Sequence, residues 1–153
     1  IEEGDLFIVD TGSVFDSYFC DFDRNYAFGF ICDEAKKAYK VVFDATDAGF
    51  NAAQVGKTTS DVYHAMNNVM QKGGALGNSV GRLGHGLGLQ LTEWPSNTAT
   101  DNTLLKPGVI LTLEPGMEYL SGKEMVHEEN IVITENGPEW LTKRAPEELP
   151  IIQ

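Results

Sequence analysis

The segment Ile8–Arg24, with the sequence IVDTGSVFDSYFCDFDR, constrains the fold of this chain more than any other stretch. Two short β-like runs flank a turn-rich middle, and each run carries one aspartate, Asp10 or Asp21. A symmetric hairpin with its turn at Phe15 and Asp16 places these two carboxylates opposite each other. Like charges directly opposed across an antiparallel pair are destabilising. The pattern therefore predicts a cation between them, and we expect a divalent metal ion.

A second predicted hairpin, centred on Ser121, presents another acidic pair. Its arms are the β-like segments Gly116–Leu120 and Lys123–Thr134. Glu114 and Glu128 are equally far from Ser121 in the sequence. In a regular register these two glutamates oppose each other on one face of the hairpin, as the two aspartates do on the first.

The fifth candidate ligand is His85, which has a glycine on each side and lies between the two acidic pairs in the sequence. Four carboxylates and one imidazole, without thiolates, suit hard or borderline divalent ions. Each acid also has an ordinary interpretation. Asp10 and Asp21 could stabilise turns, and Glu128 could form an exposed pair of charges with Glu129. The joint pattern of strands, symmetry and residue order favours the metal site.

The remaining chain predicts two helices and an irregular tail. Good helix formers with apolar residues at helical spacing indicate a helix over Asp33–Ala48, ending at Gly49. A second helix is expected to start at Thr59 or Ser60 and to end at Gly73-Gly74. From Trp140 onwards we expect coil on the surface.

Composition excludes several classes of protein. The 153 residues fit one domain, and the net charge of −12 argues against a nucleic-acid-binding surface. No apolar run approaches the ~20 residues of a membrane helix, so no membrane partner is expected. Two cysteines are too few for a disulfide framework, and a cytoplasmic location is the default expectation.

Several motifs together resemble the pita-bread metallohydrolases, which include methionine aminopeptidase, Xaa-Pro aminopeptidase, prolidase and creatinase. The matching segments follow the family order and are IVDTG, DFDR eleven residues after Asp10, GHGLGLQ, TLEPGM and HEENIVIT. The resemblance implies an α+β fold in which a curved, mostly antiparallel sheet is backed by helices. It also implies that residues 1–153 are the C-terminal portion of the catalytic domain, without the upstream helices and the N-terminal lobe.

The resemblance assigns a role to each candidate ligand. Asp10 would hold one metal ion, His85 and Glu114 the other, and Asp21 and Glu128 would bridge the two. It implies two divalent ions (Mn, Co or Zn) and a bridging hydroxide that attacks the amide carbonyl of a short peptide or a small amide. Glu114 and His85 would be the catalytic residues, with Glu114 transferring the proton.

Two substitutions depart from the family pattern and leave the substrate open. Thr92 stands where the family peptidases have a second histidine, and is a candidate substrate-binding residue. Asp23 stands where a hydroxyl is usual, and could alter metal preference or catalysis. The leading interpretation is an Xaa-Pro peptidase-like enzyme. The alternatives are a relative acting on a small non-peptide metabolite, as in creatinase, ectoine hydrolase or dimethylsulfoniopropionate lyase, or a catalytically inert binding module.

The missing upstream helices lead to a further expectation. Their absence should expose apolar sheet surface, which predicts a homodimer and allows this portion to be inactive on its own.

Overall fold

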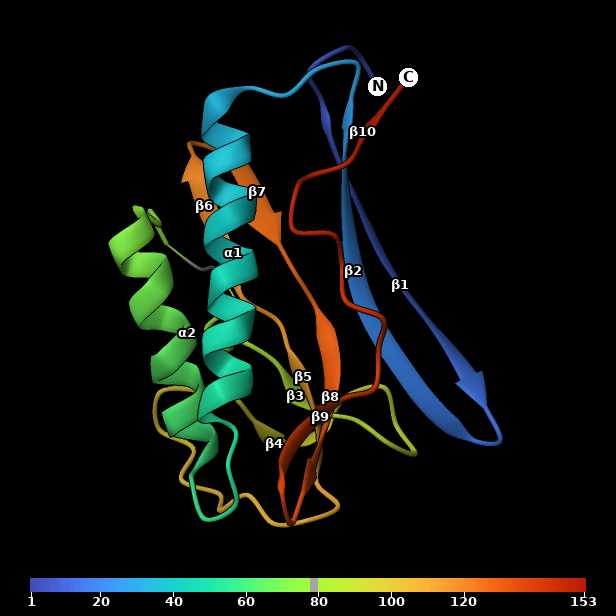
Figure 1. Ribbon diagram of the computed structural model, residues 1–153, viewed down its shortest axis with the longest axis vertical. Helices are drawn as coiled ribbons and strands as arrows, with labels where there is room; N and C mark the ends of the chain where they lie inside the picture. The colour runs from blue at the N-terminus through green and yellow to red at the C-terminus, as the bar shows by residue number, and fades with distance from the viewer. Residues whose placement is uncertain (78–79) are drawn as a thin grey trace.

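The computed structural model describes residues 1–77 and 80–153 and combines two helices with mostly antiparallel strands (Figure 1). In chain order the elements are β1 (Leu6–Phe15), β2 (Tyr18–Phe28), α1 (Asp33–Ala52), α2 (Thr59–Gly73), β3 (His85–Gly86), β4 (Glu93–Ser96), β5 (Ile110–Leu113), β6 (Gly116–Leu120), β7 (Lys123–Val126), β8 (Glu129–Thr134), β9 (Gly137–Trp140) and β10 (Ile151–Ile152). The predicted α+β class is confirmed.

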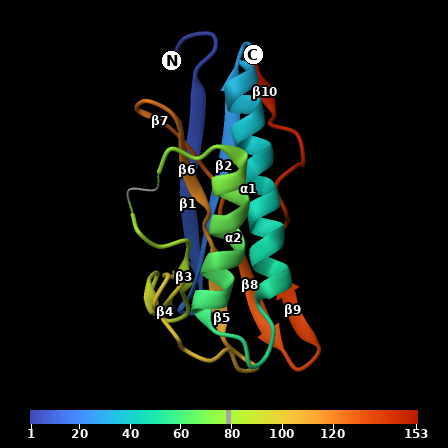
Figure 2. The ribbon, with the colours of Figure 1, turned by 90° about the vertical axis from the view of Figure 1, so that its left-hand side faces the viewer.

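The two helices lie side by side on one side of the strands (Figure 2). Helix α1 buries a stripe of small and apolar residues that includes Ala38, Val42 and Ala45. It continues past Gly49, so the predicted end there is wrong. At Gly49 a side-chain carbon would lie 2.8 Å from the sulfur of Met66 in α2. The glycine therefore allows close helix–helix packing and does not end the helix.

Helix α2 begins and ends as its sequence indicates. Thr58 is the N-cap and forms a capping box with Asp61, in which each side chain accepts a hydrogen bond from the other residue's backbone N–H. Gly74 ends the helix in the left-handed conformation, with φ at 95°. No helix among the described residues is both long and apolar enough to cross a membrane.

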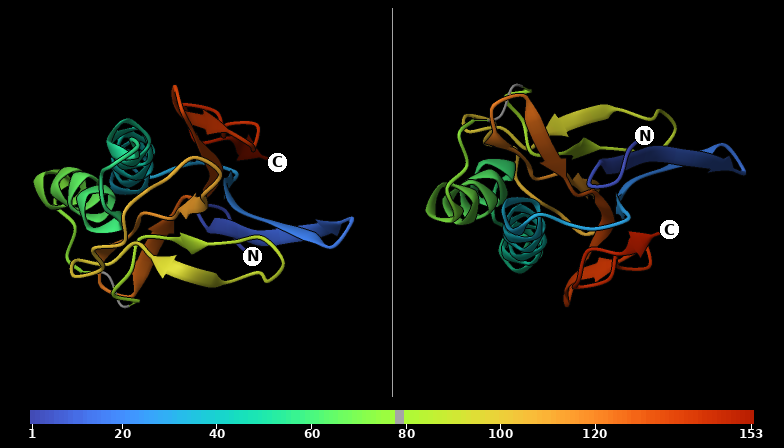
Figure 3. Two further views of the ribbon diagram at one scale, coloured as in Figure 1. Left: turned by 90° about the horizontal axis from the view of Figure 1, so that it is seen from below. Right: turned by 90° about the horizontal axis from the view of Figure 1, so that it is seen from above.

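The β1–β2 hairpin extends away from the helices (Figure 3). Its turn residues are Asp16 and Ser17, with φ at 50° and 73°. The turn expected at Phe15 and Asp16 is therefore wrong by one residue. Positive φ at both turn positions matches the twist of two-residue hairpins, and aspartate tolerates it better than a bulky phenylalanine does. This shift of one residue changes which aspartates face each other.

The second predicted hairpin is confirmed. Strands β6 and β7 pair Gly116 with Val126, while β5 and β8 pair Leu113 with Glu129. Both pairings are centred on Ser121, so one register runs through the two ladders. Glu114 and Glu128 occupy matching positions at the junction between them, and the N–H of His127 donates to the Pro115 carbonyl there at 3.1 Å.

The C-terminal segment is more ordered than predicted. After β9, Ala145 and Leu149 are buried, and the short strand β10 pairs in parallel with β2. The expectation of surface coil from Trp140 onwards is therefore wrong for these parts. Leu149 belongs to the hydrophobic core, and the Pro146 carbonyl accepts a hydrogen bond from the Tyr39 hydroxyl of α1 at 2.5 Å. These contacts are with segments distant in the sequence, so the local pattern does not reveal them.

Candidate metal centre

Four strand regions that are distant in the sequence bring acidic and imidazole side chains together. Ligand atoms of Asp21, His85 and Glu128 lie within 4.8 Å of one another. A second group, formed by Asp10, Asp23 and Glu128, meets the same limit. Glu128 belongs to both groups, so it lies between them. Four of the five predicted ligands, all except Glu114, thus lie close together. Asp23, which the sequence indicated only as a departure from the family pattern, lies with them.

Glu114, the fifth predicted ligand, borders this cluster. It belongs to neither three-residue group, but its negative charge helps to raise the pKa of Glu128 and that of Asp23. It also lines a pocket with Arg82, Met117 and Val126. Glu114 therefore lies between the acidic cluster and a small pocket.

Strand β2 is held beside β7 and β8 by side chains. The backbone N–H of Asp21 donates to Oδ1 of Asn130 at 3.0 Å, and the Asn130 amide donates back to the Asp21 carbonyl. Further along, Asn25 Nδ2 donates to the Val126 carbonyl at 2.6 Å. Arg24 Nη1 donates to the Glu128 carbonyl at 3.1 Å. These bonds fix the position of Asp21 relative to Glu128.

Neither Asn25 nor Asn130 is among the residues predicted from the sequence. Each of these residues is a polar side chain inside an otherwise strand-like run. That pattern could have indicated them, because a buried amide needs hydrogen-bond partners.

Glu129 forms a buried anchor beside the cluster. It is fully buried, and its Oε2 lies 3.1 Å from Arg24 Nη2. Its Oε1 accepts from the N–H of Ala145 at 2.8 Å and lies 3.6 Å from Arg144 Nη1. The interpretation of Glu128 and Glu129 as an exposed pair is therefore wrong, because both side chains are buried.

The backbone around His85 determines the orientation of its ring. Gly84 has φ at +121°, and a side-chain carbon there would lie 2.2 Å from the Thr112 carbonyl oxygen. Only glycine suits this close approach. The His85 backbone N–H donates to Thr112 Oγ1 at 3.1 Å. The loop is thus fixed against β5.

The hydrogen bond of the His85 ring defines its tautomer. Nδ1 lies 2.9 Å from the Gly86 carbonyl, which can only accept, so Nδ1 carries the proton. Nε2 lies 3.8 Å from Asp21 Oδ2 and 3.8 Å from Glu128 Oε1. Burial lowers the pKa of His85. The neutral ring therefore presents its Nε2 lone pair to the carboxylates, as a metal ligand does.

The carboxylates lie in a poorly solvated, mutually repulsive environment. Burial, followed by the charges of Glu114, Asp21 and Asp23, raises the pKa of Glu128 to about 9. Burial and then the charge of Asp10 raise the pKa of Asp23 to about 7. Burial also raises the pKa of Asp21 and that of Glu114. A divalent cation would remove this repulsion.

Unpartnered oxygens show that the residues fit such an ion. Among the described residues, Asp23 Oδ1, Glu114 Oε2 and Glu128 Oε1 are buried without a hydrogen-bond partner. Buried polar atoms normally find partners. An oxygen-rich set with one imidazole is also the donor set expected for borderline or hard divalent ions. The cluster therefore suits a metal ion by both geometry and chemistry.

Thr92 lies apart from the cluster. It is exposed and lines a shallow depression with Gln90, Glu93, Trp94 and Ser96. None of the five predicted metal ligands lines that depression. Its role in substrate binding stays a prediction.

Mostly antiparallel strands backed by two helices, with a buried Asp, His and Glu cluster, match the catalytic domain of the pita-bread metallopeptidases in fold and in the type of side chains at the site. The sequence model of metallopeptidase family M24 matches residues 1–135, and the chain belongs to this family.

Similar proteins and similar solved structures agree with this assignment. The Xaa-Pro dipeptidase of Pyrococcus furiosus is 32% identical over 143 residues, which are 94% of this chain and 41% of the relative. A dipeptidase structure from Pyrococcus horikoshii OT3 matches with a TM-score of 0.90 and 34% identity, covering 99% of this chain and 42% of that one.

An X-Pro aminopeptidase structure from Thermotoga maritima MSB8 matches with a TM-score of 0.89 and 29% identity, covering 99% of this chain and 43% of that one. The chain therefore spans less than half the length of these relatives.

Proposed function

We propose that this chain carries the dinuclear metal site of an Xaa-Pro peptidase-like hydrolase that cleaves short peptides. The observation that carries the proposal is the pair of three-residue ligand groups that share Glu128. The names of the relatives, which include an Xaa-Pro dipeptidase, support the choice of substrate class. The native ions are proposed to be Mn, Co or Zn.

The five ligands would divide between two ions. Asp10 would hold the first ion and His85 the second, while Asp21 and Glu128 would contact both. Glu114 would complete the second ion's ligands from the edge of the cluster. When bound, the ions would supply Lewis-acid polarisation of the amide carbonyl and activation of water.

We propose that Glu114 moves the proton. Its Oε2 is buried without a hydrogen-bond partner among the described residues, and burial raises its pKa. A carboxylate with a raised pKa can accept a proton during attack and deliver it to the leaving amine. The side chain also lines the pocket beside the cluster, which supports a position next to the scissile bond.

Arg82 gives this pocket a positive group. It lines the pocket together with Glu114, and its charge acts to lower the pKa of Glu114 against the effect of burial. A short peptide presents a free carboxylate close to its scissile bond. We propose that Arg82 binds this carboxylate, which would favour dipeptides over longer or amidated substrates.

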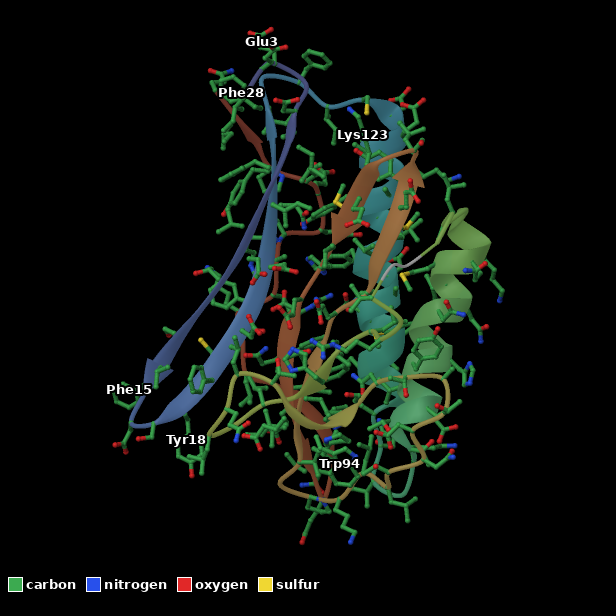
Figure 4. All side chains as sticks on the ribbon, turned by 180° about the vertical axis from the view of Figure 1, so that it is seen from behind. Glu3, Phe15, Tyr18, Phe28, Trp94 and Lys123 are labelled. Atoms are coloured by element: carbon green, nitrogen blue, oxygen red, sulfur yellow. The ribbon has the colours of Figure 1, made fainter. Side chains whose placement is uncertain are left out.

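We also propose a homodimer, on the basis of apolar side chains at the end of the β1–β2 hairpin. Phe15 and Tyr18 are 85% and 59% exposed and point away from the body of the protein (Figure 4). The Phe19 N–H donates to the Gly88 carbonyl at 2.8 Å, which places the hairpin beside a loop with exposed Leu89 and Leu91. Light scattering at high concentration tests this proposal, and a strictly monomeric protein would contradict it.

The substrate proposal is tested by product analysis of the protein loaded with Mn²⁺. We expect release of proline from Xaa-Pro dipeptides. Hydrolysis of a small non-peptide amide without cleavage of Xaa-Pro substrates would identify the metabolite-acting alternative. A metal-free protein without hydrolytic activity would identify the binding module.

A further inference from the structure

Asp23 occupies an inward-facing position on β2 that the five-ligand scheme does not use. Buried residues alternate along this strand, so Asp21, Asp23 and Asn25 point to the same face. Asp23 pairs directly with Asp10 of β1. Side chains at such opposed positions lie roughly 4.5–5.5 Å apart at Cβ. The hairpin therefore sets the carboxylate of Asp23 against that of Asp10.

The Asp23 carboxylate is buried without a compensating group. The residue is only 4% exposed, and its Oδ1 has no hydrogen-bond partner among the described residues. The neighbouring cation is engaged elsewhere. Arg24 donates to the backbone carbonyl of Asp23 at 2.7 Å and directs Nη2 to Glu129 at 3.1 Å. A buried, unpaired carboxylate is costly, so its position calls for a cation.

Ligand geometry shows where that cation would bind. One carboxylate oxygen from each of Asp10, Asp23 and Glu128 lies within 4.8 Å of the other two. The Glu128 side chain contributes a second observation, because within the described part of the chain its Oε1 is also buried without a hydrogen-bond partner. Two of the three carboxylates in this group thus each carry a buried, unpartnered oxygen.

We propose that Asp23 is an additional ligand of the metal ion held by Asp10 and Glu128, an inference that rests on the proposed dinuclear site. The ion beside Asp10 would then be bound by oxygen atoms alone, whereas the ion beside His85 has an imidazole ligand. Oxygen-only sites favour hard ions such as Mn²⁺ and Mg²⁺. The extra charge makes the site next to Asp10 the tighter of the two for Mn²⁺.

Titration with Mn²⁺, followed by the electron paramagnetic resonance signal of the free ion, tests this inference. The wild-type protein should bind two ions with different affinities. Asp23→Asn and Asp23→Thr should each weaken the tighter site by at least about 10-fold, the lower end of what losing even a hydrogen-bond partner of a metal ligand typically costs. Asp16→Asn is the matched control, since it removes the same charge from the turn of the same hairpin and should leave both affinities unchanged.

Thermal unfolding separates a ligand from a residue that only supports the fold. Removing the unpaired Asp23 charge should preserve or raise the melting temperature without metal, and should reduce the increase produced by Mn²⁺. Two-site binding that is unchanged in both Asp23 variants would overturn the role of Asp23 alone. A wild-type protein that binds no Mn²⁺ would overturn the dinuclear site and this inference together.

Discussion

Asp10 of β1 lies directly opposite Asp23 of β2, while Asp21 lies opposite Gly12. Asp10 and Asp21 are therefore diagonal neighbours, and the hairpin presents three carboxylates where two were expected. The close approach of the strands at Gly12 has a steric cause, because a side-chain carbon there would lie 2.2 Å from the Cys20 carbonyl oxygen. This register brings Asp10 and Asp23 into one of the two three-residue groups that share Glu128, and Asp21 into the other.

Replacing the proposed proton carrier should lower turnover even at Mn²⁺ concentrations high enough to compensate for its lost metal contact. Glu114→Asp keeps the carboxylate on a side chain that is one methylene shorter, whereas Glu114→Gln removes the carboxylate. We expect Glu114→Gln to lower kcat by about 10²–10⁴-fold, the usual contribution of general acid–base catalysis. Glu135→Gln, at an exposed position, is the control and should retain full activity. Equal kcat values for Glu114→Gln and wild type would exclude this role.

Arg82→Gln should change substrate preference. Loss of the cation from the pocket beside Glu114 should raise KM for a dipeptide with a free C-terminal carboxylate at least about 10-fold, since charged hydrogen bonds contribute roughly 1.5–3 kcal/mol. The KM for the corresponding C-terminal amide should change little. An equal change for both substrates would show that Arg82 does not bind the carboxylate.

The buried pair of Arg24 and Glu129, beside the cluster, should contribute strongly to the free energy of unfolding. Arg24→Ala leaves the fully buried Glu129 without its 3.1 Å partner, and removing one member of a buried pair typically costs about 3–5 kcal/mol. Lys40→Ala removes an exposed ion pair with Asp44 and should cost less than about 1 kcal/mol. Urea unfolding of both variants provides the comparison, and equal losses would contradict the account.

The metal-free protein should lose stability as the pH rises above 6.5. The pKa of Glu128 is about 9 when folded, against an ordinary value of 4.5. The folded state therefore holds a proton that the unfolded state lacks in this range. The free energy of unfolding falls by about 1.4 kcal/mol per pH unit for each such group. Asp23, with a folded pKa of about 7 against 3.8, adds to the decrease up to about that pH.

Urea unfolding in EDTA at several pH values between 6.5 and 9 checks this prediction. His127 has its pKa lowered to about 3, mainly by burial, so its opposite effect is confined to pH values below its ordinary 6.5. Glu128→Gln should flatten the profile. Stability that rises with pH in the metal-free wild type would show that these carboxylates are not buried as described.

The sequence predicted those features that depend on local chemistry and symmetry. The start of α2 at Thr59, the terminating Gly74 and the hairpin centred on Ser121 all follow from short-range rules, and the structure confirms them, although the capping hydroxyl belongs to Thr58 and not to Thr59 or Ser60. The convergence of Asp21, His85 and Glu128 was also anticipated. It came from the joint pattern, because each residue alone had an ordinary interpretation.

The sequence could not predict features that depend on which segments meet. The end of α1 was misplaced because Gly49 packs on Met66, a contact between helices. The turn was misplaced by one residue, which concealed the pairing of Asp23 with Asp10. Asn130 fixes Asp21 through bonds between strands far apart in the sequence. Local patterns contain no information about such partners.

The central claim is that Asp21, His85 and Glu128 form part of a site for two divalent ions. Calorimetric titration of the protein with Mn²⁺, Co²⁺ and Zn²⁺, alongside Asp21→Asn, tests it most directly. Asp21→Asn keeps the size of the side chain and removes the charge that would bridge the ions. We predict two ions bound per wild-type chain and loss of at least one of them in the variant. Identical binding by the two proteins, or none by the wild type, would contradict the account.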